Sequence, residues 1–206
     1  MSELLKLISK GKGQQLEFEK ELTNSQRIAS VLVSFANTDG GSLLVGVKDN
    51  GKINGIDPSE GAFVLERMVN LFTRPLVEFD TVIWQEGHHL VLEVRIQKSN
   101  NMHFANRIGD GWAVFVRIGD RTCYANKIIQ LAWKLSGDAK NSSKFSLDCQ
   151  AEIIESLYGD AMTLSKLYSN ANRSLKEVDY NLSYLIYKGV VLFDLKDDHF
   201  VYVLAQ

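Results

Sequence analysis

The stretch SFANTDGGSLLVGVKD, residues Ser34–Asp49, decides the fold. It begins inside a helix whose apolar residues recur at helical spacing: Ile28, Val31, Leu32 and Phe35. It ends in Ser42–Lys48, which has the apolar run of a buried strand. Glycines permit positive φ between the two, and successive N–H groups in such a turn can form an anion-binding concavity. A plain helix-to-strand turn at Gly40-Gly41 is the alternative, and the stretch alone does not separate the two.

Outward from this stretch, helices alternate with strands and hairpins. The periodicity predicts helices at Ser2–Ser9, from Asn24 or Ser25 to Asp39, at Glu60–Phe72 and at Asn126–Leu135. It predicts strands at Gln15–Glu19, Ser42–Lys48, Lys52–Ile56, Phe79–Gln85, His89–Gln97 and Trp112–Ile118, with a loop at Ser99–Gly111. This mixture indicates an α/β (α+β) fold with a mixed sheet over residues 1–135.

A polar stretch, SGDAKNSSKF at Ser136–Phe145, resembles a linker because small polar residues bury too little surface to order the backbone. We place a linker at 136–146 and a second domain at 147–206. That domain reads as helices at Leu147–Tyr158, Thr163–Asn170 and Ser174–Tyr187, then strands at Val190–Leu195 and His199–Leu204. Three helices followed by a hairpin is the order of a winged helix.

Composition excludes several classes of protein. The longest apolar runs fall short of the ~20 residues that span a bilayer, and no signal segment opens the chain, so we expect a cytoplasmic protein without a membrane partner. The 2 cysteines and 4 histidines show no metal-ligand spacing, so we expect no metal and no cofactor. The net charge of −2 argues against polyanion binding by the whole surface. Basic residues dominate between Arg95 and Lys134, however, and acidic ones after Phe145.

Several motifs resemble the Schlafen-type AlbA-like domain, in the same order and at similar spacing. They are LEFE at Leu16–Glu19, FANTDGGSLLVGVKDNG at Phe35–Gly51, Gly55-Ile56, and FVRIGDRT at Phe115–Thr122 with Ala125. The resemblance runs from about Leu5 to Leu135 and implies nucleic-acid binding. Such domains are commonly followed by winged-helix segments in bacterial proteins, and some animal relatives cleave RNA.

The relatives that cleave RNA carry three carboxylates, and only two of them are matched here. Glu17 and Asp49 match, but Lys12 stands at the first position. Because an ammonium removes a ligand and repels a divalent ion, the resemblance favours a protein without catalytic residues. A metal-dependent ribonuclease using Glu17 and Asp49 is the alternative. Nucleotide hydrolysis is excluded because no GxxxxGK[ST] phosphate loop occurs.

Candidate nucleic-acid contacts gather around the glycine turn and the last strand of the first domain: Asn37, Gly40, Gly41, Arg107, Arg117, Arg121 and Lys127. We favour Arg117, with an internal salt bridge as its alternative. Trp112 and Tyr124 could stack on bases, although strand aromatics are commonly core. Tyr180, Tyr184 and Tyr187 line one side of the last helix and predict a protein interface, with packing against the first domain as the alternative.

Together these features predict a regulatory protein that binds DNA or RNA, resembles a transcriptional regulator and forms a homodimer or other homo-oligomer. A protein-binding adaptor, suggested by the acidic second domain, is a further alternative.

Overall fold

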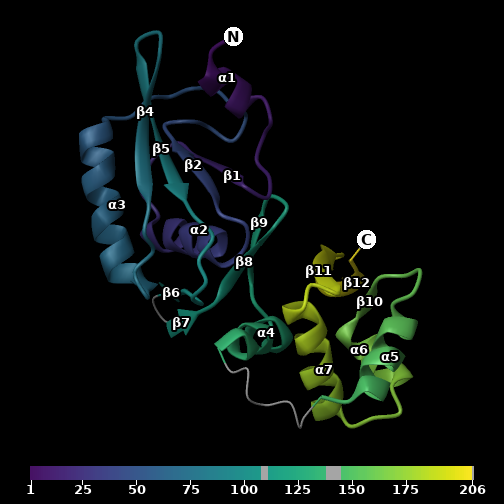
Figure 1. The fold of residues 1–206 in the computed structure, drawn as a ribbon. Helices are drawn as coiled ribbons and strands as arrows, with labels where there is room; N and C mark the ends of the chain where they lie inside the picture. The colour runs from purple at the N-terminus through teal and green to yellow at the C-terminus, as the bar shows by residue number, and fades with distance from the viewer. Residues whose placement is uncertain (108–110, 138–144, 206) are drawn as a thin grey trace. The chain divides into compact units, whose positions relative to one another are not determined.

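The computed structural model describes residues 1–107, 111–137 and 145–205. By the contacts among its residues, the chain divides into two units, Met1–Tyr124 and Ala125–Gln206. Figure 1 shows the helices and strands of each. None of the helices in the described ranges combines the length and apolar character that crossing a membrane requires.

A four-stranded mixed sheet forms the centre of the first unit. Its strands lie in the order β1 (Leu16–Glu19), β2 (Gly41–Val45), β5 (His89–Ile96), β4 (Asp80–Glu86). β1 runs parallel to β2, whereas β2, β5 and β4 pair antiparallel. Parallel neighbours need a crossover connection, which is helix α2 (Ser25–Asn37). The mixed-sheet α/β class predicted from the sequence is confirmed.

Helices cover both faces of this sheet. On one face, the apolar residues of α2 and α3 (Pro58–Phe72) form the main core with Leu43, Val45, Leu92 and Val94. On the other face, α1 (Glu3–Ile8) packs Leu4 and Ile8 against Phe18, Leu44 and Val91. Figure 1 shows α3 running beside β4 and β5. Residues of β1 and of the first turns of α2 both line the candidate site described below.

Two smaller sheets complete the first unit. One holds β3 (Thr73–Arg74), β6 (Phe104–Arg107) and β7 (Gly111–Ala113), and the other holds β8 (Phe115–Ile118) and β9 (Arg121–Tyr124). The expected loop at 99–111 thus contains a strand, and the expected strand at 112–118 is two strands. Lys52–Ile56 contributes an isolated bridge from Ile53 to Val47 rather than a full strand. Pairing with distant partners, which local patterns do not reveal, produces these differences.

The second unit contains helices α4 (Lys127–Gly137), α5 (Leu147–Ser156), α6 (Leu164–Asn170) and α7 (Leu175–Tyr187). Its three-stranded sheet has the order β10 (Met162–Thr163), β12 (His199–Leu204), β11 (Val191–Lys196). The hydroxyls of Thr163 and Ser174 accept from N–H groups in the first turns of α6 and α7, as capping residues do. Three helices followed by a hairpin are observed in the order that the sequence predicts.

Helix α4 packs with the second unit, although the sequence places it at the end of the first domain. Ile128 lies in one apolar cluster with Leu182 and Leu185, and the Ser183 hydroxyl donates to the Ile128 carbonyl at 3.0 Å. The apolar face of α4 is therefore matched to α7. Residues 138–144 of the expected linker lie outside the described residues, and the linker itself stays a prediction.

Candidate nucleic-acid groove

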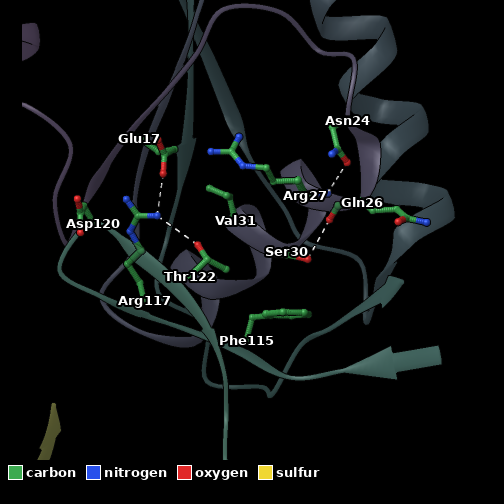
Figure 2. Close-up of a pocket in the computed structure, with 10 residues that line it drawn as sticks. All are labelled: Glu17, Asn24, Gln26, Arg27, Ser30, Val31, Phe115, Arg117, Asp120 and Thr122. Carbon is green, nitrogen blue, oxygen red and sulfur yellow. Dashed lines mark hydrogen bonds and ion pairs between the residues drawn. The ribbon is translucent and has the colours of Figure 1, made fainter. Parts of the chain in front are cut away.

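A polar groove of about 390 Å³ lies between β1, the first turns of α2 and the β8–β9 hairpin (Figure 2). Its lining residues are mostly polar or charged: Glu17, Asn24, Gln26, Arg27, Ser30, Val31, Phe115, Arg117, Asp120 and Thr122. Asn24 caps α2 by accepting from the Arg27 N–H at 3.0 Å. This cap fixes where the helix begins and so places the Arg27 side chain over the groove.

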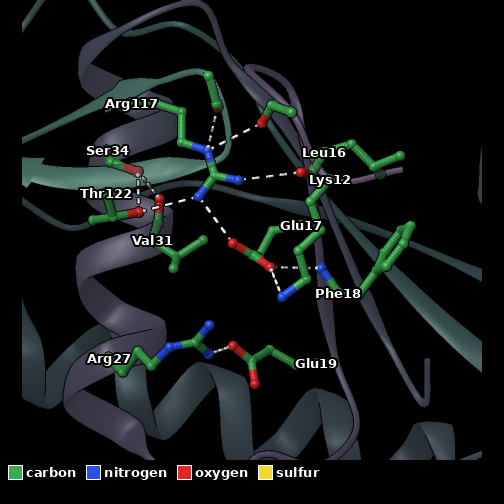
Figure 3. Close-up of polar contacts among 12 residues, drawn as sticks. Lys12, Leu16, Glu17, Phe18, Glu19, Arg27, Val31, Ser34, Arg117 and Thr122 are labelled. Carbon is green, nitrogen blue, oxygen red and sulfur yellow. Dashed lines mark hydrogen bonds and ion pairs between the residues drawn. The ribbon is translucent and has the colours of Figure 1, made fainter. Parts of the chain in front are cut away.

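Arg117 forms the inner wall of this groove, and its side chain is 0% exposed. The guanidinium donates hydrogen bonds to five acceptors: the carbonyls of Gly13 and Gly119 at 3.1 Å each, Leu16 at 3.2 Å, Thr122 Oγ1 at 3.2 Å and Glu17 Oε2 at 2.9 Å. Its carbon lies 5.2 Å from the centroid of the Phe35 ring. Figure 3 shows these bonds converging on one side chain.

The structure therefore corrects the interpretation of Arg117 as a phosphate contact. A guanidinium that is buried and directed at internal acceptors has no exposed face for a ligand. The internal salt bridge, which the sequence left open as the alternative, is the arrangement observed. Arg117 joins β8 to β1 and to the loop before it, so its role is to build the groove wall.

Lys12 brings together the two carboxylates that the sequence singled out. Its Nζ lies 2.6 Å from Glu17 Oε1 and 2.8 Å from Asp49 Oδ1. Glu17 Oε1 also accepts from the Phe18 N–H at 3.0 Å. Both oxygens of Glu17 are thus engaged, one with Lys12 and Phe18 and the other with Arg117 (Figure 3).

These contacts keep both acids ionised. Burial raises the pKa of Glu17, but hydrogen bonds from Lys12, Arg117 and the Phe18 N–H outweigh it, so the pKa lies below the ordinary value of 4.5. The hydrogen bond from Lys12 and its positive charge lower the pKa of the exposed Asp49. The cluster therefore holds two carboxylates and two cations in a charge-balanced arrangement at neutral pH.

This donor set does not fit the divalent metal that the resemblance would imply. A divalent ion needs several oxygen ligands with free lone pairs, but both oxygens of Glu17 already accept hydrogen bonds from charged groups and the Lys12 ammonium lies between Glu17 and Asp49. Among the described residues, no group of three or more His, Cys, Asp or Glu could hold a metal ion. No metal-dependent step follows from this geometry.

The glycine turn is also an internal feature. The N–H groups of Thr38 and Gly40 both donate to the Phe35 carbonyl, which ends α2. Gly40 has φ +70°, and a side chain there would meet the Ile96 carbonyl at 2.7 Å. A side chain at Gly41 would meet the Phe35 ring at 2.7 Å. The plain helix-to-strand turn, rather than an anion-binding concavity, accounts for both glycines.

Asn37 supports the same turn from inside. Its side chain is buried, donates to the carbonyls of His103 and Phe115 at 2.9 Å each, and accepts from the His103 N–H at 2.8 Å. Asn37 therefore ties α2 to the segments before β6 and in β8. The structure does not present it for nucleic-acid contact.

The other predicted basic contacts are dispersed. Arg121 is exposed at the start of β9, beside the groove residues Asp120 and Thr122. The side chain of Arg107 lies outside the described residues. Lys127 belongs to the second unit, where its Nζ lies 2.8 Å from Asp179 Oδ2. Arg121 therefore adjoins the groove lining in sequence.

The three tyrosines of α7 remain partly accessible. Tyr187 is 43% exposed, and Tyr180 and Tyr184 are half-buried. The Phe145 ring lies 4.2 Å from the Tyr184 ring and 5.9 Å from the Tyr180 ring, between centroids. This chain's own Phe145 thus covers part of the stripe, and the predicted protein interface stays a prediction.

Arg27 is the groove residue that sequence reasoning missed. Its side chain is 47% exposed and pairs with the carboxylate of Glu19, as Figure 3 shows. Strand alternation places Glu17 and Glu19 on the same side of β1, and Arg27 lies one turn into the helix that follows. That alternation, combined with the cap at Asn24, is the signal that could have identified it.

Solved structures that resemble this chain include two with low sequence identity. The DIP2311 protein from Corynebacterium diphtheriae has a TM-score of 0.46 and 15% identity, over 91% of this chain and 34% of that one. The present chain thus spans about a third of its length. The N-terminal domain of a putative ATP-dependent DNA helicase RecG-related protein from Nitrosomonas europaea has a TM-score of 0.40 and 18% identity, over 62% of this chain and 97% of that one. No curated protein matches.

The family comparison is more extensive and confirms the resemblance seen in the motifs. The family described as "Schlafen, AlbA_2" matches residues 12–126, which is more than half of the 206 residues and includes every groove residue named above. The chain therefore belongs to the Schlafen, AlbA_2 family.

Proposed function

We propose that this protein binds nucleic acid through the groove of its first unit and does not cleave it. Membership in the Schlafen, AlbA_2 family supports a role with nucleic acid. The observation that carries the proposal is the position of Lys12, whose ammonium lies between Glu17 and Asp49. An ammonium there takes the place that a divalent ion would need between the two acids, which favours binding of a nucleic acid without hydrolysis.

The groove offers groups that suit phosphates and sugars. Arg27 supplies an exposed guanidinium, while the side chains of Asn24 and Gln26 supply amides along the same wall. Contacts of these kinds position a nucleic-acid backbone without reading its sequence. We therefore expect weak dependence on base sequence and a strong dependence on salt.

The second unit acts, in this proposal, as a winged-helix partner domain that mediates self-association. The exposed Tyr187 and half-buried Tyr184 on α7 give an aromatic surface that a second copy could cover. Two acids on the same helix are already paired within the unit: Glu177 with Arg173 at 3.4 Å and Asp179 with Lys127. Sedimentation of the wild type and of the Tyr187→Ser variant tests this part. The wild type should self-associate more strongly than the variant, and a wild-type protein that stays monomeric at high concentration would contradict the proposal.

Titrations of labelled duplex DNA, single-stranded DNA and RNA at two salt concentrations test the main proposal. Binding that weakens steeply as salt rises is expected, because phosphate contacts release counterions. Absence of binding to all three, at low salt, would overturn the proposal and favour the protein-binding adaptor.

The competing ribonuclease function is favoured by one observation, the proximity of Glu17 and Asp49 across Lys12. Incubation of labelled RNA with magnesium or manganese distinguishes the two. We expect no cleavage. Metal-dependent cleavage that disappears in Asp49→Ala would establish the ribonuclease, and this variant is preferable to Glu17→Ala because the Asp49 side chain is 86% exposed.

A further inference from the structure

The small sheet β3-β6-β7 presents one outward face with an unusual set of side chains. Arg74 pairs with Phe104 across β3 and β6, and Asn106 pairs with Trp112 across β6 and β7. Because side chains alternate along a strand, these four residues share one face. On the opposite face, Thr73 and Ala105 are 3% and 0% exposed, so that face packs on the core.

Trp112 is exposed to an extent that packing does not explain. It is 37% exposed, and the Arg74 guanidinium carbon lies 4.5 Å from its ring centroid. A guanidinium over an indole is a favourable cation–π pair, and it holds both flat groups at the surface. Phe104 and Asn106 beside them are half-buried. The face thus carries a stacked pair, a second aromatic ring and an amide.

The charge of these strands is one-sided. The strand sequences TR, FANR and GWA contain no acidic residue, and the cation on this face is Arg74. The chain as a whole has 23 basic and 25 acidic residues, so the charge of these strands differs in sign from that of the whole chain. An anionic partner is therefore favoured at this face.

We propose that this face binds an unpaired nucleobase of single-stranded nucleic acid. The base adds to the Trp112–Arg74 stack, the Asn106 amide donates to or accepts from its edge, and the arginine charge attracts the adjacent phosphate. The neighbours of Trp112 on this face, Asn106 and Arg74, supply the amide and the cation that a base edge and its phosphate would contact. The inference rests on the proposed function and narrows its ligand to a single strand.

The test compares Trp112→Ala with Trp112→Phe and with a control, Ile83→Ala. Ile83 is 60% exposed on β4 of the same unit and lies outside this sheet. A fluorescein-labelled oligonucleotide, single-stranded or annealed to its complement, is titrated with each folded variant. Affinity for the single strand should fall roughly tenfold in Trp112→Ala and recover largely in Trp112→Phe, which keeps a stacking ring. Ile83→Ala should bind as wild type does, and the duplex should bind all four proteins alike.

The outcomes separate this inference from the function on which it rests. Unchanged single-strand affinity in Trp112→Ala overturns the base site but leaves nucleic-acid binding intact. Equal losses for single strand and duplex also overturn it, since a duplex offers no unpaired base. Loss of self-association without loss of single-strand binding would identify a protein interface instead. Failure of the wild type to bind any nucleic acid overturns both proposals. Should Trp112→Ala misfold, Arg74→Gln gives the same comparison.

Discussion

Two arginines of the same groove, Arg117 and Arg27, differ in burial and therefore in what each can bind. The Arg117 side chain is 0% exposed and donates to five internal acceptors, whereas the Arg27 side chain is 47% exposed and pairs with Glu19. Only the second can exchange its partner for a phosphate. A basic residue in a sequence motif is thus no guide to ligand contact until its burial is known. Replacing Arg117 should reduce stability, whereas replacing Arg27 should reduce binding.

The largest expected effect is that of Arg117→Ala on stability. Removing this guanidinium leaves Glu17 buried with one charged partner fewer and takes one donor from each of three carbonyls, so we expect a loss of about 3–5 kcal/mol in the free energy of unfolding. Denaturant titration followed by circular dichroism measures it. Arg117→Lys should recover little, because an ammonium cannot reproduce the planar fork. A variant of wild-type stability that had lost only its nucleic-acid binding would restore the phosphate-contact interpretation.

Lys12→Glu should be the next most harmful change. It places a third carboxylate beside Glu17 and Asp49 and removes two ionic hydrogen bonds, for an expected cost of about 1.5–3 kcal/mol. Because a divalent ion would then have oxygen ligands in place of the ammonium, manganese should raise the melting temperature of the variant but not of the wild type. A gain of RNA cleavage would show that only the third carboxylate was missing. Equal effects of manganese on both proteins would show that Lys12 does not exclude the ion.

Gly41→Ala tests the turn that the sequence associated with anion binding. A Cβ there would lie 2.7 Å from the Phe35 ring and 2.9 Å from the Gln15 carbonyl, so we expect overpacking that costs about 1–3 kcal/mol. Gly13→Ala is the matched control, since its added methyl would meet nothing within 4 Å. If Gly41→Ala kept full stability and lost nucleic-acid affinity, the turn would be a binding element after all.

The sequence predicted the first unit well where local pattern and family resemblance coincide. The helix that ends before Gly40-Gly41 and the strand after it are found nearly as expected, because helical spacing and a glycine stop are local signals. Strand β6 was missed because FANR has no alternation of its own and is stabilised by β3 and β7. The sequence assigned helix α4 to the first domain, whereas the helix packs with the second unit. An amphipathic pattern shows that one face of a helix is buried but does not show which element covers it.

The candidate site could be predicted only in part. Lys12, Glu17 and Asp49 were identified from the motifs and do come together. That the ammonium bridges the two acids was not predictable, because Asp49 is reached only after the crossover through α2. Arg117 is buried in contact with Glu17, about a hundred residues away in sequence. Asn37 is buried in contact with His103, several tens of residues away. One-dimensional patterns carry no information about such pairings.

The pH dependence of the free energy of unfolding reports on Glu17, the buried carboxylate that pairs with Arg117. The pKa of Glu17 is lowered in the folded state, so its stabilising contribution is fully present above the unfolded value near 4.5 and is lost as pH falls through the folded value. Each such carboxyl adds a slope of up to about 1.4 kcal/mol per pH unit in that window. Glu93, whose pKa is also lowered, contributes in the same direction.

We therefore expect Glu17→Gln to have a shallower loss of stability than wild type between neutral pH and pH values below 4.5. Denaturant midpoints at a series of pH values measure it. The matched control is Glu21→Gln, because Glu21 is an exposed carboxylate outside the groove lining. A slope that is the same in wild type and Glu17→Gln would mean that the Glu17 ion pair contributes nothing to acid sensitivity.

The smallest effect on stability, and the most informative one for function, is expected from Arg27. Its replacement alone would leave the Glu19 carboxylate without its cation, so Arg27→Ala is best combined with Glu19→Gln, which removes the unpaired charge. Because both charges are removed together, the double variant should fold with a change below about 1.5 kcal/mol. If Arg27 contacts one phosphate, affinity should fall roughly fivefold for every sequence tested, and the slope of log K against log salt should decrease by about one. Arg67→Ala is the control, because Arg67 is an exposed arginine on α3 that lies against Phe63, away from the groove. Equal losses in both variants would show a general charge effect, whereas an unchanged salt slope in the Arg27 variant would remove Arg27 from the interface and leave the groove without its exposed guanidinium.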